Sequence, residues 1–174
     1  MRFFSTRPRI LHYTRNRCMQ RAAYALLQGD SDMKSSARNQ FAGKVTSVIP
    51  GPVNAEVELT LTSGDRIVSV VTMGSVKELG LRIGSEATAL IKAPWVILMT
   101  EDAGLKTSAR NHLQGTVSRL VKGAVNTEVS LQTTGGLTVN AIITNESAES
   151  LGLDIGKPVS AIVKASHVIL ATRA

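Results

Sequence analysis

The sequence is poor in cysteine, in aromatic residues and in long apolar runs. Its 174 residues contain one cysteine, Cys18, so no internal disulfide can form, and His12, His112 and His167 lie far apart in the sequence. Their spacing is not that of a zinc site. No run of eighteen apolar residues occurs, which predicts a soluble chain. With the single cysteine, this favours a cytoplasmic, reducing environment.

Acidic residues are absent before Asp30, and this absence locates the charge of the chain. The formal net charge is +7, of which residues 1–34 contribute seven cations and two acids, or +5, leaving +2 for the other 140 residues. The Arg-rich segment 1–34 resembles a transit peptide or a short basic arm. Residues 17–27 are compatible with an amphipathic helix. We interpret the segment as an extension, or as the remnant of an upstream segment joined to the rest of the chain.

The rest of the chain is an internal repeat. An offset of 72 residues aligns positions 36–98 with 108–170 without a gap, with about 27 of 63 positions identical. The matched blocks include "SARN" at Ser36 and Ser108, "VNAEVEL" with "VNTEVSL", and "LGLRIG" with "LGLDIG". Self-similarity over a fixed period indicates two copies of one structural module.

Each copy reads as short strands separated by turns about every ten residues, which is typical of a small barrel. We expect strands near residues 43–49, 53–61, 66–72, 87–92 and 96–99, with a hairpin turn at "SGD" or, in the second copy, "TGG". Apolar and polar residues alternate from Val53 to Thr62, which predicts one buried and one wet face. A helical turn over residues 75–79 should end at Gly80.

The predicted fold class is all-β, with two tandem OB-like five-stranded barrels, each carrying a short helical turn, behind a basic N-terminal extension. The predicted boundaries are 1–34 for the extension, 35–102 for the first module and 103–174 for the second. A barrel of this size is near the lower limit for an adequate core. We therefore expect the modules to pair and the chain to form a homo-oligomer, a dimer or a trimer.

Residues suited to catalysis are few. His112 aligns with Gln40 and His167 with Trp95, so neither histidine recurs in the other copy. Glu56 and Glu128 do recur, but on the wet face of a strand, where an isolated carboxylate is usually solvated or at an interface. "GLDIGKP" lacks the spacing of a phosphate loop and is interpreted as a turn. The sequence predicts a protein that is not an enzyme and has no catalytic residues.

Polar residues that recur in both copies are mostly cations and hydrogen-bond donors. They are Ser36 and Ser108, Arg38 and Arg110, Asn39 and Asn111, Asn54 and Asn126, Thr72 and Thr144, Ser75 and Ser147, and Lys92 and Lys164. Such a set suits a small oxyanion, because hydroxyls and free N–H groups satisfy its oxygens while Arg and Lys offset its charge.

Structural alternatives stay open for several of these residues. Ser75 and Ser147 are ordinary N-cap candidates, and capping of the short helix is favoured over ligand contact for them, with Glu78 completing a capping box in the first copy. Lys92 and Lys164 could protect edge strands. Asn54 and Asn126 could satisfy local backbone groups. Trp95 is interpreted as a core or interface residue.

The ordered blocks "SARN", "VNxEV", "LGLxxG" and "IKA" or "VKA", present twice over residues 35–172, resemble two tandem Mop modules. These TOBE-type units are the molybdate-binding modules of molbindins and of the C-terminal part of molybdate-dependent transcriptional regulators. The resemblance implies that molybdate or tungstate binds between modules. Ser36, Arg38 and Lys92 would face Thr72 and Ser75 of a neighbouring module. Ser108, Arg110 and Lys164 would face Thr144 and Ser147 of another, and Asn54 and Asn126 would line a second class of site.

The resemblance predicts molybdate storage, homeostasis or sensing, with no catalytic cofactor, no directly coordinated metal cation and no membrane partner. The main alternative is the ligand-sensing part of a molybdate-responsive regulator without its DNA-binding domain, and no nucleic-acid binding is then expected of this chain. An oligonucleotide-binding barrel is disfavoured, because the repeats contain only Phe41 and Trp95 as aromatic residues. The accessory module of a transport ATPase would need a nucleotide-binding domain.

Overall fold

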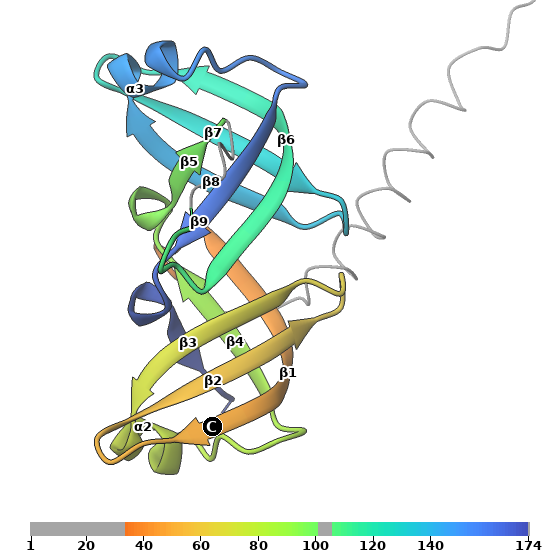
Figure 1. Cartoon of the computed structure of the whole chain (residues 1–174), viewed down its shortest axis with the longest axis vertical. Coiled ribbons are helices and arrows are strands. Elements are labelled where there is room, and N and C mark those ends of the chain that lie inside the picture. The colour runs from red at the N-terminus through yellow and green to blue at the C-terminus, as the bar shows by residue number, and fades with distance from the viewer. Residues whose placement is uncertain (1–33, 101–105, 174) are drawn as a thin grey trace, which may run out of the picture.

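The structure is a computed structural model that describes residues 34–100 and 106–173. The predictions for the basic extension and for a helix over residues 17–27 lie outside these residues. Two five-stranded sheets, each curled into an OB-like barrel, are stacked along the long axis of the molecule (Figure 1). The prediction of two tandem all-β barrels is confirmed.

The first copy contains five strands and two short helices. They are β1 (Asn39–Pro50), β2 (Asn54–Leu61), β3 (Arg66–Thr72), α2 (Met73–Glu78), β4 (Glu86–Ile91), η1 (Ala93–Trp95) and β5 (Ile97–Met99). The second copy repeats this order with β6 (Asn111–Lys122), β7 (Asn126–Thr133), β8 (Thr138–Thr144), α3 (Asn145–Ser150), β9 (Pro158–Val163), η2 (Ala165–His167) and β10 (Ile169–Ala171).

The last strand of each copy completes the sheet of the other. The strand orders are β10-β4-β1-β2-β3 and β5-β9-β6-β7-β8, and all pairs are antiparallel. Leu170 of β10 lies opposite Ala89 of β4, and Leu98 of β5 lies opposite Ala161 of β9. The order of the strands in the chain favours all five strands of a copy in one sheet, so this reciprocal exchange is a difference from the expected arrangement.

The alternating pattern of β2 and β7 places one side of each strand in the core. Ala55, Val57, Leu59 and Leu61 are buried as predicted, and they belong to one cluster of buried apolar residues that continues through both modules. Val53 continues the same alternation but lies just before the strand and is 71% exposed.

The long strands β1 and β6 each pair with two neighbours and contain a glycine at a close approach to the next strand. A Cβ atom at Gly115 would come within 2.4 Å of the carbonyl oxygen of Gln132, and one at Gly43 within 2.7 Å of that of Thr60. Both distances are too short for a side chain, so glycine is required where the backbones approach this closely. A β-bulge follows in each strand, between Val45 and Ser47 and between Val117 and Arg119.

The short helices begin earlier than the sequence pattern predicts. The N-cap residues are Thr72 and Thr144, whose hydroxyls accept hydrogen bonds from the backbone N–H of Ser75 and Ser147 at 3.1 Å. The prediction that Ser75 and Ser147 cap the helices, with Glu78 in a capping box, is therefore wrong. Gly80 follows the C-cap residue Leu79 with a φ of +60°, as expected for a glycine that ends a helix.

Candidate functional site

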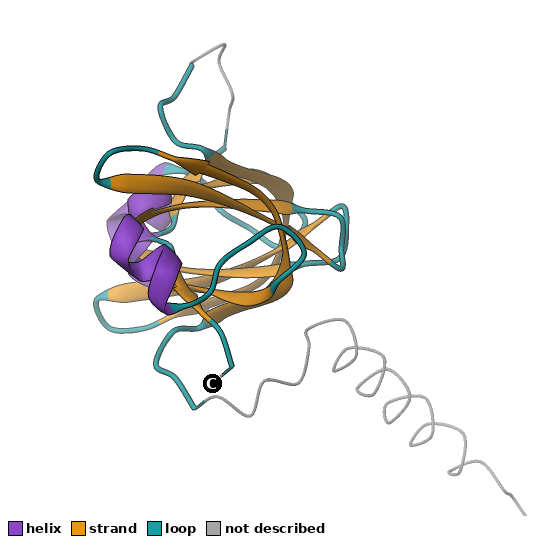
Figure 2. Ribbon diagram, turned by 90° about the horizontal axis from the view of Figure 1, so that it is seen from below, coloured by secondary structure: helices purple, strands orange, loops and turns teal. Residues whose placement is uncertain are grey.

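The described helices lie on one side of the molecule, and residues predicted to bind an anion cap each of them. Figure 1 shows α2 and α3 near the two ends of one long side, with η1 and η2 between them, and Figure 2 places the helices on the same side of the strands. Thr72 and Thr144 cap α2 and α3, and Lys92 and Lys164 are the N-cap residues of η1 and η2. The repeat therefore places its hydroxyls and its lysines on a common surface.

Ser36, Arg38 and Lys92 lie at one corner of the first sheet. Asn39 pairs with Ile91 in the ladder between β1 and β4, so Arg38 and Lys92 flank the end of that ladder. All three predicted ligands are exposed. Asn111 pairs with Val163 in the same way, which places Ser108, Arg110 and Lys164 at the corresponding corner of the second sheet, also exposed.

Each corner contacts the opposite module. The helix η1, which follows Lys92, packs against β8, and η2, which follows Lys164, packs against β3. Within one chain the Lys92 corner therefore lies beside the strand that ends at Thr144, and the Lys164 corner beside the strand that ends at Thr72.

The Thr–Ser pairs at the helix starts are preorganised. Thr72 Oγ1 and Ser75 Oγ are 2.9 Å apart, and Thr144 Oγ1 and Ser147 Oγ are 2.8 Å apart. Thr72, Thr144 and Ser147 are exposed and Ser75 is half-buried. Within the described residues, no hydrogen bond or ion pair joins these pairs to the Arg and Lys side chains.

Asn54 and Asn126 are exposed at the starts of β2 and β7, and Asn54 lies opposite Thr72 and Asn126 opposite Thr144. Both asparagines are therefore next to the Thr–Ser pairs, and each lies two residues along its strand from the glutamate that pairs with an arginine of the opposite module. The structure brings Asn54 and Asn126 to the hydroxyl half of the predicted donor set.

Asn39 and Asn111 have a role that the sequence did not reveal. Both are only 1% exposed, and each joins its module to an edge strand of the other. Asn111 accepts a hydrogen bond from the N–H of Val68 at 2.7 Å and donates to the carbonyl of Val68 at 2.8 Å, while Asn39 contacts the N–H and carbonyl of Asn140 in the same way. The asparagine of "SARN" thus joins the two modules through hydrogen bonds of its buried side chain. Its recurrence at the same position of both copies was the available signal.

Both arginines of "SARN" form ion pairs across the module boundary. Arg38 Nη1 donates to Glu128 Oε2 on β7, and Arg110 Nη2 donates to Glu56 Oε1 on β2 at 2.7 Å. The two carboxylates, for which the sequence left a solvated or an interface position open, therefore lie at an interface within the chain.

A further ion pair supports α3 in the second module. Lys122 donates to Glu149 Oε1 at 2.7 Å, and this ammonium lowers the pKa of the Glu149 carboxyl below its usual range. The pair lies in solvent and joins the end of β6 to the helix that carries Ser147.

Trp95 and His167 meet at the boundary between the modules. Their ring centroids are 5.4 Å apart, and Lys92 Nζ lies 6.0 Å from the centroid of Trp95. Because the sequence contains one tryptophan, Trp95 reports on the surroundings of Lys92.

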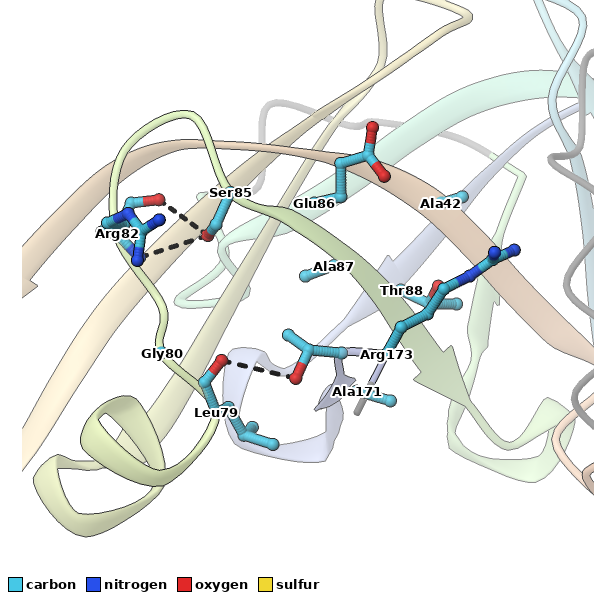
Figure 3. A pocket seen from close by; sticks show the side chains of 11 residues that line it. Ala42, Leu79, Gly80, Arg82, Ser85, Glu86, Ala87, Thr88, Ala171 and Arg173 are labelled. Atoms are coloured by element: carbon cyan, nitrogen blue, oxygen red, sulfur yellow. Dashed lines mark hydrogen bonds between the residues drawn. The ribbon is translucent and has the colours of Figure 1, made fainter.

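An open groove of ≈ 750 Å³ lies elsewhere on the first module (Figure 3). Leu79, Arg82, Thr88 and Arg173 are among its lining residues, and none of the predicted anion ligands lines it.

In the part of the chain that the structure describes, no group of three or more His, Cys, Asp or Glu residues could hold a metal ion. No helix in the same part is long and apolar enough to cross a membrane.

These features define the class of the protein as a tandem pair of OB-like β-barrel modules with a repeated polar surface. The chain belongs to the TOBE domain family, whose sequence profile matches residues 35–98 and 107–170.

Relatives in this family carry names connected with molybdenum. The chain is 41% identical over 163 residues to "Molybdenum transport protein ModE" of Herbaspirillum seropedicae, covering 94% of this chain and 61% of that protein. It is 46% identical over 139 residues to "Molybdenum-pterin-binding protein MopA" of Rhodobacter capsulatus, covering 80% of this chain and 52% of that protein. The chain thus spans between half and two thirds of the length of these relatives.

Among solved structures, the chain is similar to the "cytoplasmic molybdate-binding protein ModG" in a "form with molybdate bound". The two share 48% sequence identity with a TM-score of 0.79, over 81% of this chain and 100% of that one. The similarity therefore extends over both modules and not over one barrel alone.

Proposed function

We propose that this protein binds molybdate or tungstate at boundaries between modules, without catalysis, and that it stores, buffers or senses the anion in the cytoplasm. The observation that carries the proposal is the duplicated set of exposed Ser, Arg, Lys and Thr side chains in a chain similar to the molybdate-bound ModG. Hydroxyls and cations together replace the hydration shell of a doubly charged tetrahedral oxyanion.

The complete site in this proposal is formed between chains of a homo-oligomer, a dimer or a trimer. One support is that, among the described residues, no hydrogen bond or ion pair joins the Thr–Ser pairs to the Arg and Lys side chains within one chain. A second support is the set of large apolar residues that are exposed in both copies at equivalent positions. They are Ile49 and Val121, Val53 and Val125, Ile83 and Ile155, and Ile97 and Ile169. Repeated exposed apolar residues of this kind are typical of association surfaces.

Calorimetric titration with molybdate, tungstate and sulfate tests the proposal. Molybdate and tungstate should bind and change the fluorescence of Trp95, while sulfate should bind much more weakly. Lys92→Met should weaken molybdate binding at its sites roughly tenfold or more, the cost of one charge-assisted contact. Lys44→Met is the matched control, because Lys44 is an exposed lysine on β1 outside the predicted set. Equal affinity for sulfate, or equal effects of the two variants, would refute the proposal.

A second candidate function is the ligand-sensing part of a molybdate-responsive regulator. The observation that favours it is the match to ModE of Herbaspirillum seropedicae, which covers 94% of this chain and so continues beyond the two repeats into residues 1–34. Native mass spectrometry with metal analysis, with and without molybdate, separates the candidates. A change of assembly state on binding supports sensing, and a filled assembly of constant size supports storage.

A further inference from the structure

The arginines assigned to anion binding are already bound to carboxylates of the opposite module. Arg38 reaches Glu128 on β7 of the second module, and Arg110 reaches Glu56 on β2 of the first, so the two contacts are reciprocal. The arginine side chains are 50% and 57% exposed, while both glutamates are about three-quarters buried. The glutamates are thus fixed on the barrels, and the arginines are free to turn toward solvent.

A carboxylate and an oxyanion that share one guanidinium repel each other. Two like charges a few ångströms apart oppose each other appreciably near a protein surface, and more so when one of them is a dianion. An anion that binds at the Arg38 or Arg110 corner must therefore either separate the arginine from its glutamate or bind despite repulsion by that carboxylate. We propose that Glu128 and Glu56 compete with the bound anion for Arg38 and Arg110, respectively, and thereby set the affinity of each site for the anion. We call each of these Arg–Glu pairs a latch. This inference rests on the proposed function.

The two latches differ in strength. Glu128 also accepts a hydrogen bond from Arg119 at 3.2 Å through its other carboxylate oxygen. The residue equivalent to Arg119 in the first copy is Ser47, and among the described residues no second cation pairs with Glu56. When Arg38 turns away, Glu128 keeps one cationic partner, whereas Glu56 loses its partner when Arg110 turns away. The Arg38–Glu128 pair therefore separates more easily than the Arg110–Glu56 pair. For this reason the Arg38 corner binds the anion more tightly than the Arg110 corner.

The test is calorimetric titration of the full chain with molybdate for wild type, Glu56→Gln and Glu128→Gln. Removing a competing carboxylate should raise affinity, by about three- to tenfold for Glu56→Gln and by a smaller factor for Glu128→Gln. A purely structural role for these glutamates predicts the opposite sign, since loss of an intermodule contact would weaken a site built at the boundary. Glu58→Gln is the matched control, two residues along β2 from Glu56 and paired with Arg66 instead.

The asymmetry between the two latches is tested by a separate variant. Arg119→Ser installs the residue of the first copy and should lower the affinity of the tighter site about threefold or more, toward that of the weaker one. Lys44→Ser removes the same charge from an exposed position on β1, the equivalent strand of the first copy, and should leave the ratio of the two affinities unchanged.

The outcomes distinguish the latch from the function on which it rests. If wild type does not bind molybdate, the proposed function fails and the latch fails with it. If wild type binds but Glu56→Gln and Glu128→Gln stay within twofold of Glu58→Gln, only the latch is overturned. An equal gain for both glutamate variants overturns the role of Arg119.

Discussion

Asn111 shows how much of the structure depends on single amide groups. Its side chain pairs with both backbone groups of Val68, and it also donates to the carbonyl of Val163 at 3.2 Å. Asn111→Ala would leave these buried groups without partners, at a cost of about 2–3 kcal/mol in the free energy of unfolding. Urea denaturation measures this loss.

The matched control for that prediction is Asn126→Ala, which removes an exposed asparagine from the same module. A surface change of this kind should alter stability by no more than about 0.5 kcal/mol. Equal losses in the two variants would mean that the contact of Asn111 with Val68 does not hold the modules together.

The same residues show where sequence reasoning reached its limit. The repeat identified Asn39 and Asn111 as recurrent, but an asparagine at the start of a strand is ordinarily a surface residue, and each of these two packs against a strand of the opposite module. Thr72 and Ser75 lie three residues apart and each can cap a helix, so local chemistry could not select between them. The ion pairs of Arg38 and Arg110 join residues 90 and 54 positions apart, which no local pattern encodes.

At the level of elements, the helices α2 and α3 end differently in the two modules. In the second copy Lys157 donates to the carbonyls of Leu151 and Gly152 at 2.8 and 3.0 Å, at the C-terminal end of α3. The equivalent residue in the first copy is Ser85, whose hydroxyl instead donates to the carbonyl of Arg82 at 2.7 Å. The groove of the first module lies where that lysine is missing (Figure 3).

Ser85→Lys should therefore transfer the contact from one copy to the other. An ammonium on the carbonyls of Leu79 and Gly80 should stabilise the protein by about 0.3–1 kcal/mol, since cations favour a helix C-terminus. Ser85→Met, which has similar length but no charge, is the control. Thermal unfolding at two salt concentrations provides the measurement. A gain that the methionine variant reproduces, or that does not shrink in high salt, would contradict the electrostatic explanation.

The strands themselves were largely predictable, because the period-two pattern of β2 and β7 and the turn glycines determine where chain segments are extended. The strand with which the last strand of each copy pairs could not be predicted. Residues 97–99 read "ILM" and 169–171 read "ILA", so either strand fits either sheet. In the structure η1 packs on β8 and η2 packs on β3, so each short helix leads the chain to the opposite module. The exchange of the last strands depends on this connection.

For the whole molecule, the exchange makes each barrel depend on residues of the other copy. Leu170, in the last strand of the second copy, is 5% exposed and completes the first sheet beside β4, while Leu98 completes the second sheet beside β9. Leu170→Ala should cost about 2–5 kcal/mol, as expected for a buried leucine. Its local effect should appear in the first module, although the substitution belongs to the second.

Hydrogen exchange of backbone amides measures where protection is lost. Leu170→Ala should accelerate exchange in β4 more than in β9, and Leu98→Ala should do the reverse, because local opening follows the pairing of the strands. Ile169→Ala, in the same strand but with a side chain 53% exposed, is the control and should affect neither strand appreciably. If Leu170→Ala instead released β9 and left β4 protected, the fifth strand of each copy would pair within its own module, and the reciprocal exchange would be wrong.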